Sequence, residues 1–248
     1  MGFFRVSIDK TRAVLYTLGF LASLYAVELA SSASVFDAVV GDYSALRSCF
    51  ATIMAPILWN LLPQIFGPAL INWIGRRQAM LVFSLYVFLF TCFRSWAFQM
   101  GIADDKTSFD VLLPFFPNAT VFHNIFFAVG AATVLVGTVL TSASFIRLGI
   151  FGTYMGEFFG VMLSEKITTF PFDVVDNPMY FGSSLMHIGL AIMEQSPVGV
   201  VLGAVVFWWY YMAALYEEPL MVEMYKKDLG KVRVRHGWDI LASFATAA

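Results

Sequence analysis

The stretch VFHNIFFAVGAATVLVGTVLTSASFI, at residues 121–146, decides the fold class of this chain. It contains no Asp, Glu, Lys or Arg, and it is rich in Val, Leu, Ala and Phe. A helix of roughly 20 such residues crosses the hydrocarbon core of a bilayer. Because the stretch is longer than that, it predicts a transmembrane helix.

The composition of the whole chain points the same way. Its 248 residues are 59% hydrophobic and 13% charged, whereas soluble domains carry about 25% charged residues. A formal net charge of −2 gives no basic surface for nucleic acid. Cys49 and Cys92 lie in or beside apolar runs, so neither a disulfide framework nor a metal cluster is expected. These features exclude a soluble enzyme and predict an all-α, polytopic transmembrane bundle.

Apolar windows with at most one charged residue predict five to six membrane segments in all. The second window contains Pro56, Pro63 and Pro68, so we expect a broken or re-entrant segment there. The first window is interpreted as an uncleaved span, because its apolar run is longer than that of a signal peptide. The windows lie at residues 13–34, 48–75, 78–101, 111–146, 180–193 and 197–216.

The distribution of basic residues predicts the orientation of these segments. If the amino terminus is cytosolic and each segment crosses once, only Arg47 and Lys106 lie on the opposite side. Cytosolic loops carry an excess of Lys and Arg, and the carboxyl terminus is then cytosolic as well. The basic residues on the cytosolic side are Arg5, Lys10, Arg12, Arg76, Arg77, Arg147, Lys166, Lys226, Lys227, Lys231, Arg233 and Arg235.

Glycines recur after the fourth window. Gly152, Gly156 and Gly160 are spaced by four residues, so on a helix they would form one smooth face. Such a face favours close packing of helices in membranes. The alternative is a groove in which a cofactor lies against the bare backbone.

The pair Asn177-Pro178 predicts the start of the fifth segment, because Pro is favoured at the first position of a helix. One interpretation is an ordinary capped helix at the membrane surface. The other is a site for an anionic group, because the first N–H groups of a helix are unpaired and its amino end is positive.

Two adjacent carboxylates, Glu217 and Glu218, follow the last apolar window, and Pro219 is expected to stop the helix there. Negative charges at the carboxyl end of a helix oppose its dipole and each other. The pair is therefore either a solvated helix end or a site that binds a cation.

Two further polar residues stand inside predicted spans. His187 lies in the fifth window and Arg94 in the third. An ionisable residue in a membrane segment is a functional candidate by default. The alternatives are a hydrogen-bonded packing role for His187, and for Arg94 a side chain that snorkels to the interface or pairs with an acid. The common hydrolase, zinc-protease and nucleotide-binding motifs are missing from the sequence.

Four strings between residues 152 and 219 resemble the small eukaryotic phospholipid N-methyltransferases: GTYMGEFFG at 152–160, FPFD at 170–173, NPMYFGS at 177–183 and LYEEP at 215–219. Order and spacing match over about residues 50–228. The resemblance implies a methyltransferase membrane domain at 48–228. Residues 1–47 then form an extension with an extra helix, and residues 229–248 a basic cytosolic tail.

The resemblance also implies the activity. Members of this family use S-adenosylmethionine to methylate phosphatidylethanolamine or its mono- and dimethyl forms, which yields phosphatidylcholine. We expect an enzyme of the endoplasmic reticulum membrane whose phospholipid substrate enters from the bilayer. The alternatives are an isoprenylcysteine-type carboxyl methyltransferase and a non-enzymatic membrane transporter or lipid-binding protein.

The residues expected to bind the cofactor follow from the same resemblance. The family's Gly-x-Gly element falls on Leu135, Val136 and Gly137, with Leu in place of the first Gly, and its paired glutamates are Glu217 and Glu218. Gly152, Gly156 and Asn177 complete the expected cofactor site. A base must remove a proton from the amine, and the candidates are His187, Tyr180 and Glu218.

Overall fold

The computed structural model describes residues 10–161, 163, 167, 169–175 and 177–229, and this part of the chain is a bundle of helices. Of the residues described, 85% are helical. In chain order the helices are α1 (Lys10–Ala30), α2 (Val35–Gly41), α3 (Tyr43–Ile74), α4 (Arg76–Ala103), η1 (Asp110–Phe115), α5 (Ala119–Thr153), η2 (Gly156–Phe159), α6 (Pro178–Met193) and α7 (Pro197–Leu229).

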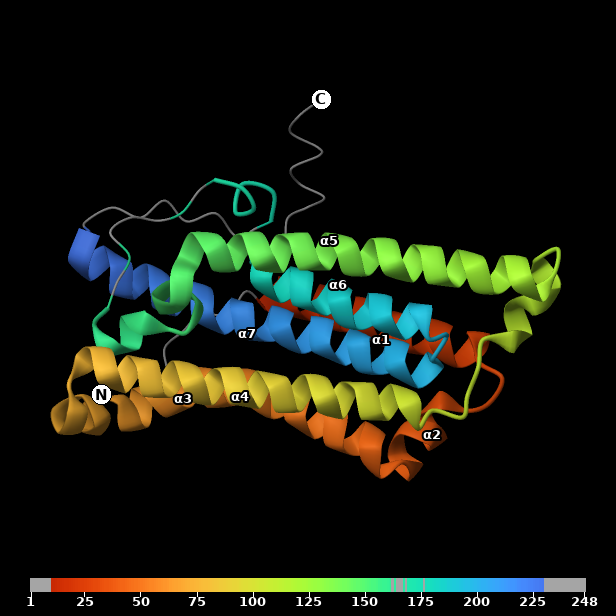
Figure 1. Cartoon of the computed structure of the whole chain (residues 1–248), viewed down its shortest axis with the longest axis horizontal. Helices are drawn as coiled ribbons and strands as arrows, with labels where there is room; N and C mark the ends of the chain where they lie inside the picture. Colours follow the sequence, from red (N-terminus) through yellow and green to blue (C-terminus); the bar gives the residue numbers. More distant parts are fainter. Residues whose placement is uncertain (1–9, 162, 164–166, 168, 176, 230–248) are drawn as a thin grey trace.

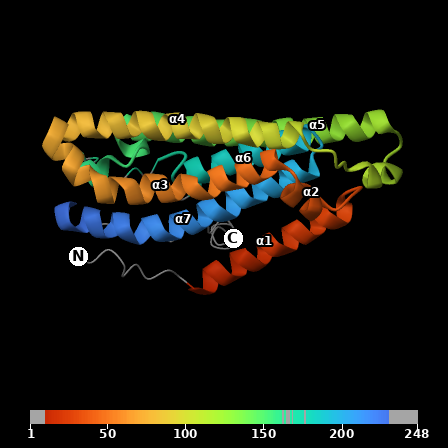
Figure 2. The same ribbon diagram turned by 90° about the horizontal axis from the view of Figure 1, so that it is seen from below.

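The long helices run in alternating directions along the bundle (Figures 1 and 2). Helices α1, α4 and α6 point one way, and α3, α5 and α7 point the other way. The turn between α3 and α4 and the end of α7 therefore lie at one end of the bundle, which we call the α3–α4 end, and α1 begins opposite the middle of α7. This is the arrangement expected if each segment crosses the membrane once.

Five of the helical segments, those of α1, α3, α4, α5 with η2, and α7, are long and apolar enough to cross a membrane. Helix α6 has only 16 residues, fewer than the roughly 20 that span a bilayer core. The prediction of an all-α transmembrane bundle is confirmed. The predicted tail at 229–248 lies outside the described residues except for Leu229.

The prediction of a broken or re-entrant segment at 48–75 is wrong, because α3 continues through all three prolines. A proline removes a backbone donor, and side chains can satisfy carbonyl groups near it in a membrane helix. Trp209 Nε1 donates to the Ile53 carbonyl at 2.7 Å, in the turn before Pro56. Gln64 Nε2 donates to the Asn60 carbonyl at 2.7 Å, in the turn before Pro63.

The fourth segment begins later than its charge-free window suggests. Residues 111–115 belong to η1, and α5 starts at Ala119, where the Asn118 side chain accepts a hydrogen bond from Val121 N at 2.9 Å. Pro114 and Pro117 lie in the intervening segment and disfavour a continuous helix. Near its far end α5 bends at Gly149, whose φ of 61° is outside the helical region.

The expected helix stop at Pro219 is also wrong. Helix α7 continues through Glu217, Glu218 and Pro219 to Leu229. Pro219 removes one backbone hydrogen-bond donor from the helix. The Leu, Met and Val residues that follow it keep the segment apolar. The two carboxylates are therefore inside a helix, and the opposition to the helix dipole that we expected does not arise.

The three glycines spaced by four residues do not share a helix face. Helix α5 ends at Thr153, Met155 is left-handed with φ 58°, and Gly156 opens η2. Gly160 then ends η2 in a left-handed conformation with φ 71°. The smooth face predicted from the spacing is absent because the chain leaves the helix between Gly152 and Gly156.

Helices α5 and α6 pack closely through glycines. A Cβ atom on Gly137 would lie 2.5 Å from the Gly182 carbonyl, and one on Gly189 would lie 2.8 Å from the Gly130 carbonyl. Small residues let membrane helices approach to this distance. Because this face of α6 lies against α5, other faces of α6 are available to contact α4 and α7.

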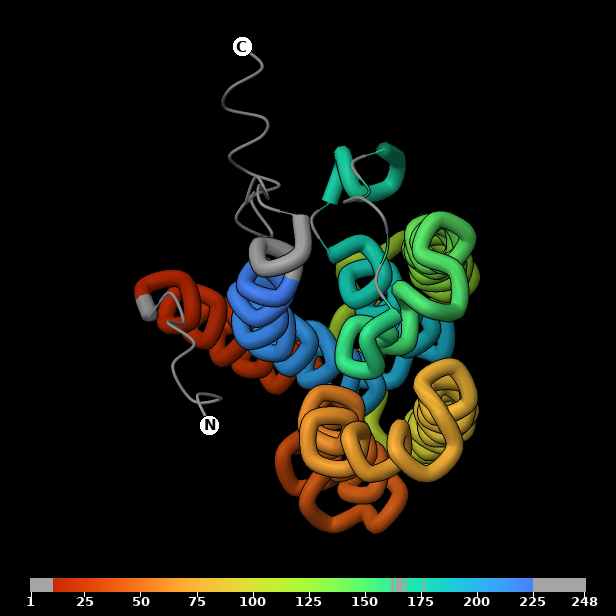
Figure 3. The backbone as a smooth tube through the Cα atoms, turned by 90° about the vertical axis from the view of Figure 1, so that its left-hand side faces the viewer, coloured from red at the N-terminus to blue at the C-terminus, as the bar shows by residue number. Residues whose placement is uncertain are grey.

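The main core lies where α3, α4, η2 and α7 meet, as Figure 3 shows from the α3–α4 end. Helix α1 packs on the outside of α7. There Tyr16 stacks on Tyr211 at 3.8 Å, and Trp208 Nε1 donates to Thr17 Oγ1 at 3.1 Å. The buried core residues are Ala55, Trp59, Ala79, Met80, Phe83, Val87, Phe159, Val206 and Tyr210.

We expect Gly130→Val to destabilise the bundle, because a Cβ at residue 130 would lie 2.6 Å from the Gly189 carbonyl. Overpacking of this kind costs about 1–3 kcal/mol. Thermal unfolding in lipid nanodiscs measures the effect. Gly19→Ala is the control, because nothing lies within 4 Å of its added Cβ. Equal unfolding temperatures for the two variants would contradict the close α5–α6 contact.

Candidate functional site

Glu217 is the centre of a polar cluster inside the bundle. Its side chain is 8% exposed, and its Oε1 accepts hydrogen bonds from helices on two sides. Tyr180 of α6 donates its hydroxyl proton at 2.5 Å, and Asn60 of α3 donates from Nδ2. One carboxylate oxygen therefore joins α3, α6 and α7.

Asn60 leaves an acceptor open beside this carboxylate. Its Nδ2 also donates to the Pro56 carbonyl at 3.0 Å. Its Oδ1 is buried and has no hydrogen-bond partner among the described residues. A buried acceptor without a donor is costly, so the cluster is suited to a ligand that donates hydrogen bonds.

Aromatic rings form one wall of the cluster. Trp59 Nε1 donates to the Tyr180 hydroxyl at 3.0 Å. The Tyr180 ring stacks on Tyr210 with centroids 4.5 Å apart and an interplanar angle of 21°. Trp59 lies 6.0 Å from Tyr210. The electron-rich faces of such rings attract cations.

The second carboxylate binds the start of α6. Asn177 Nδ2 donates to Glu218 Oε1 at 3.0 Å. Asn177 occupies the N-cap position, yet its side chain makes no capping hydrogen bond, and Pro178 follows at the first helical position. The Asn177 side chain thus holds Glu218 at the start of α6 instead of capping the helix.

Helix periodicity explains why these residues meet. Tyr210 and Glu217 are separated by seven residues on α7 and therefore share one face. That face meets the first turn of α6, which carries Tyr180. Asn60 and Trp59 come from the middle of α3. The proline-containing helix thus brings an amide and an indole to the carboxylate.

His187 lies two turns along α6 from Tyr180, about 10 Å away along the helix axis. It is buried, its Nδ1 is 2.7 Å from the Ser183 carbonyl oxygen, and its ring packs edge-on against Phe98 at 4.6 Å. These contacts fit a hydrogen-bonded packing role better than direct contact with the Glu217 cluster.

The expected glycine element lies on α5, and its three residues differ in their surroundings. Leu135 and Val136 are 64% and 50% exposed on the surface of α5. Gly137 is packed against Gly182 in the α5–α6 contact. Gly152 packs near Leu148, and a Cβ on Gly156 would lie 2.7 Å from the Phe151 carbonyl.

The sequence interpretation did not assign Asn60, Trp59 or Tyr210 to the site. The available signal is an amide, Asn60, in a long window without charges. Within the described part of the chain, no group of three or more His, Cys, Asp or Glu residues could hold a metal ion.

Comparison with known proteins adds independent information. The phospholipid methyltransferase family model matches residues 125–228. The phosphatidylethanolamine N-methyltransferase of Homo sapiens is 43% identical over 101 residues, which are 41% of this chain and 51% of that protein. The Rattus norvegicus enzyme of the same name is 41% identical over 113 residues, 46% of this chain and 56% of its own length. The chain thus spans about half the length of these mammalian relatives.

Fungal relatives match over a longer region. The phosphatidyl-N-methylethanolamine N-methyltransferase of Saccharomyces cerevisiae is 30% identical over 177 residues, which cover 70% of this chain and 81% of that protein. No solved structure matches the chain. Because the fungal alignment covers most of both proteins, the resemblance seen in the four sequence strings is confirmed: the chain belongs to the phospholipid methyltransferase family.

Proposed function

We propose that this protein transfers a methyl group from S-adenosylmethionine to the amine of phosphatidylethanolamine or of its mono- and dimethyl forms, and so produces phosphatidylcholine. Family membership and the names of the relatives support the reaction class. The observation that carries the proposal is the buried carboxylate of Glu217 beside the open acceptor of Asn60, because this pair is suited to a cationic ligand.

The groups around Glu217 fit this methyl donor. When bound, S-adenosylmethionine supplies a methyl group on a positively charged sulfur, and it carries a free ammonium group. Glu217 Oε2 and Asn60 Oδ1 are acceptors, so they can take hydrogen bonds from that ammonium. We assign Glu217, Glu218 and Asn177 to this part of the site. The contribution of Leu135, Val136, Gly137, Gly152 and Gly156 to cofactor binding stays a prediction.

The aromatic wall has a second role in the proposed reaction. Each methyl transfer leaves a positive charge on the headgroup nitrogen. The stacked rings of Tyr180 and Tyr210 can stabilise this charge by cation–π attraction, which is worth about 2 kcal/mol or more when water is excluded. In the proposed reaction the two tyrosine rings therefore also orient the amine and shield it from water.

The amine must lose a proton at each transfer, since an alkylammonium resembling that of lysine has a pKa of about 10.4. Of the three candidates for the base, we assign this role to Tyr180. Its hydroxyl can accept the amine proton while its own proton passes to Glu217 Oε1, 2.5 Å away. The other candidates are less suitable, because His187 is two turns away and Glu218 is bound by Asn177.

The location of the site agrees with the proposed orientation in the endoplasmic reticulum membrane. Glu217 is closer to the Leu229 end of α7 than to Pro197, so it lies toward the α3–α4 end. The exposed residues Arg76 and Arg77 are at this end, as expected of the cytosolic side. A water-soluble donor would reach Glu217 from there.

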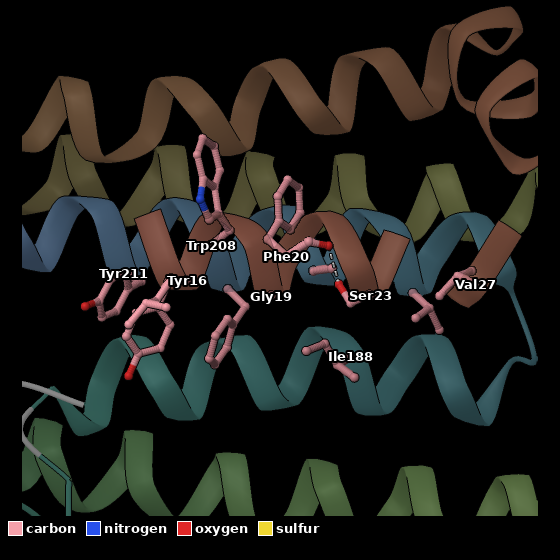
Figure 4. A pocket seen from close by; sticks show the side chains of 12 residues that line it. Tyr16, Gly19, Phe20, Ser23, Val27, Ile188, Trp208 and Tyr211 are labelled. Atoms are coloured by element: carbon pink, nitrogen blue, oxygen red, sulfur yellow. Dashed lines mark hydrogen bonds between the residues drawn. The ribbon is translucent and has the colours of Figure 1, made fainter. Parts of the chain in front are cut away.

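An apolar groove between α1, α6 and α7 is a suitable place for an acyl chain of the lipid (Figure 4). It runs along membrane-spanning helices, where hydrocarbon is the surrounding medium. Ile188 and Tyr211 line it, and these residues follow His187 and Tyr210 in the sequence. We propose that it guides the phospholipid. The residues that line it are Leu15, Tyr16, Gly19, Phe20, Ser23, Val27, Ile188, Val200, Ala204, Phe207, Trp208 and Tyr211.

Glu217→Gln tests the donor site. The variant keeps the shape of the side chain and removes its charge, so we expect the Kd for S-adenosylmethionine to rise about 10- to 100-fold, as when a charged hydrogen bond is lost. Calorimetry on protein in nanodiscs measures the Kd, and transfer of radiolabelled methyl groups to phosphatidylethanolamine measures the activity.

The matched control is Glu223→Gln, which changes an exposed residue of the same helix and should bind the donor as the unchanged protein does. Folded wild-type protein that neither binds S-adenosylmethionine nor methylates lipid would refute the proposed function. Undiminished binding by Glu217→Gln would refute the assignment of Glu217.

Tyr180→Phe separates proton removal from binding. The ring that stacks on Tyr210 remains, so the donor Kd should change little, while kcat should fall about 10²- to 10⁴-fold with the loss of a general base. His187→Gln is the comparison and should retain far more activity. If Tyr180→Phe is active and His187→Gln is inactive, the base is His187 and the assignment of Tyr180 is wrong.

Gly19→Leu tests the acyl groove. Nothing lies within 4 Å of a Cβ at this position, so the larger side chain can enter the groove without straining α1. We expect the KM for long-chain lipid to rise about fourfold for each methylene displaced, with donor binding unchanged. Ala22→Leu, on an exposed part of α1 outside the groove, is the control. The same KM in both variants would exclude the groove as a lipid site.

A further inference from the structure

Arg94 is buried in the middle of α4, within a segment long and apolar enough to span the membrane. Its side chain is 2% exposed, so it does not snorkel to the interface. Phe98, one turn further along α4, packs against His187 of α6 at 4.6 Å. Arg94 therefore lies on the face of α4 that is directed into the bundle.

The guanidinium group of Arg94 lacks an acidic partner in the described part of the chain. Its Nε and Nη1 atoms are buried without a hydrogen-bond partner. Its carbon Cζ lies 5.2 Å from the centre of the Tyr210 ring. The expected pairing with an acid is thus not found among the described residues, and the contact with an aromatic face leaves Nε and Nη1 without acceptors.

Burying the Arg94 guanidinium in this way costs free energy, and no hydrogen bond to Nε or Nη1 from the described residues offsets that cost. Arginine stays protonated in proteins, and a buried charge without partners is strongly unfavourable. Buried donors of this kind suggest that a ligand with acceptor atoms completes the site. The fork of N–H groups matches the two oxygens of a carboxylate or phosphate.

The position of Arg94 relative to Glu217 indicates the kind of ligand. Tyr210 contacts the Arg94 guanidinium and stacks on Tyr180, whose hydroxyl donates to Glu217. A continuous series of contacts therefore links the buried cation, through Tyr210 and Tyr180, to the buried carboxylate. A ligand lying along this pair would carry a positive group near Glu217 and a negative group near Arg94.

We propose that Arg94 binds an oxyanion of a substrate: the phosphodiester of the phospholipid headgroup or the carboxylate of the methyl donor. This inference rests on the proposed function, in which both substrates combine positive nitrogen or sulfur with such an oxyanion. Arg94 fixes the distance of the headgroup or the donor from Glu217 and acts as a binding residue, with no part in proton transfer.

The test uses Arg94→Met and Arg94→Gln in the full chain in nanodiscs, with Arg77→Met, at an exposed position of the same helix, as control. Without substrates, both Arg94 variants should unfold at the same or a higher temperature than wild type, because an unpaired buried charge is removed. The affinity for one substrate should fall about 10- to 100-fold, and Arg94→Lys should recover part of it.

Two measurements identify the source of the oxyanion. A raised Kd for S-adenosylmethionine without lipid, at an unchanged KM for phosphatidylethanolamine, indicates the donor carboxylate. A raised KM for phosphatidylethanolamine at an unchanged donor Kd indicates the phosphodiester. Either result supports the inference.

The inference is overturned if both affinities are unchanged, or if the variants unfold at a lower temperature or do not fold, because Arg94 would then stabilise the free protein. Failure of the proposed function is distinguishable from these outcomes, since it appears in the wild-type protein as missing methyl transfer. In that case the inference is tested by binding alone. Phosphatidylethanolamine or S-adenosylmethionine should raise the unfolding temperature of wild type more than that of Arg94→Met.

Discussion

The hydrogen bonds that meet at Glu217 Oε1 are the constraint on which the site depends. A carboxylate taken out of water needs donors, and here Tyr180 and Asn60 supply them from two other helices. Because each donor comes from a different segment, satisfying this one oxygen fixes the relative positions of α3, α6 and α7. The same bonds place the indole of Trp59 and the ring of Tyr210 beside the carboxylate. The hydrogen bonds that stabilise the buried carboxylate therefore also position the aromatic wall.

Prolines within α3 and glycines between α5 and α6 are compatible with this arrangement of helices. Helix α3 carries prolines through its middle, and side-chain donors such as Gln64 and Trp209 bond to nearby carbonyls. Close contact of α6 with α5 relies on facing glycines, since hydrocarbon gives helices no hydrophobic reason to associate. The short helix α6 is thereby held along the longer α5, with the first turn of α6 directed at Glu217.

Long apolar stretches with few charges predicted most of the fold, because a bilayer requires long apolar helices. The errors arose where local rules compete with tertiary contacts. Pro56, Pro63, Pro68 and Pro219 were interpreted as breaks, but their helices continue. The glycines at 152–160 were placed on a helix that ends at Thr153. For the site, the motif residues Tyr180, Asn177, Glu217 and Glu218 do converge, whereas Asn60 was overlooked because its partner is 157 residues away in the sequence.

The origin of the site residues has a consequence for how the family's signature segment can work. The region matched by the family model starts at residue 125, and it contains Tyr180, Tyr210 and both glutamates. Asn60, Trp59 and Arg94 all come before it. A fragment restricted to the signature segment would contain Glu217 and Glu218 without Asn60. The buried carboxylate of Glu217 would then have one hydrogen-bond donor fewer. The proposed activity thus depends on both halves of the chain, because the part before residue 125 supplies the amide and the indole that contact the glutamate cluster.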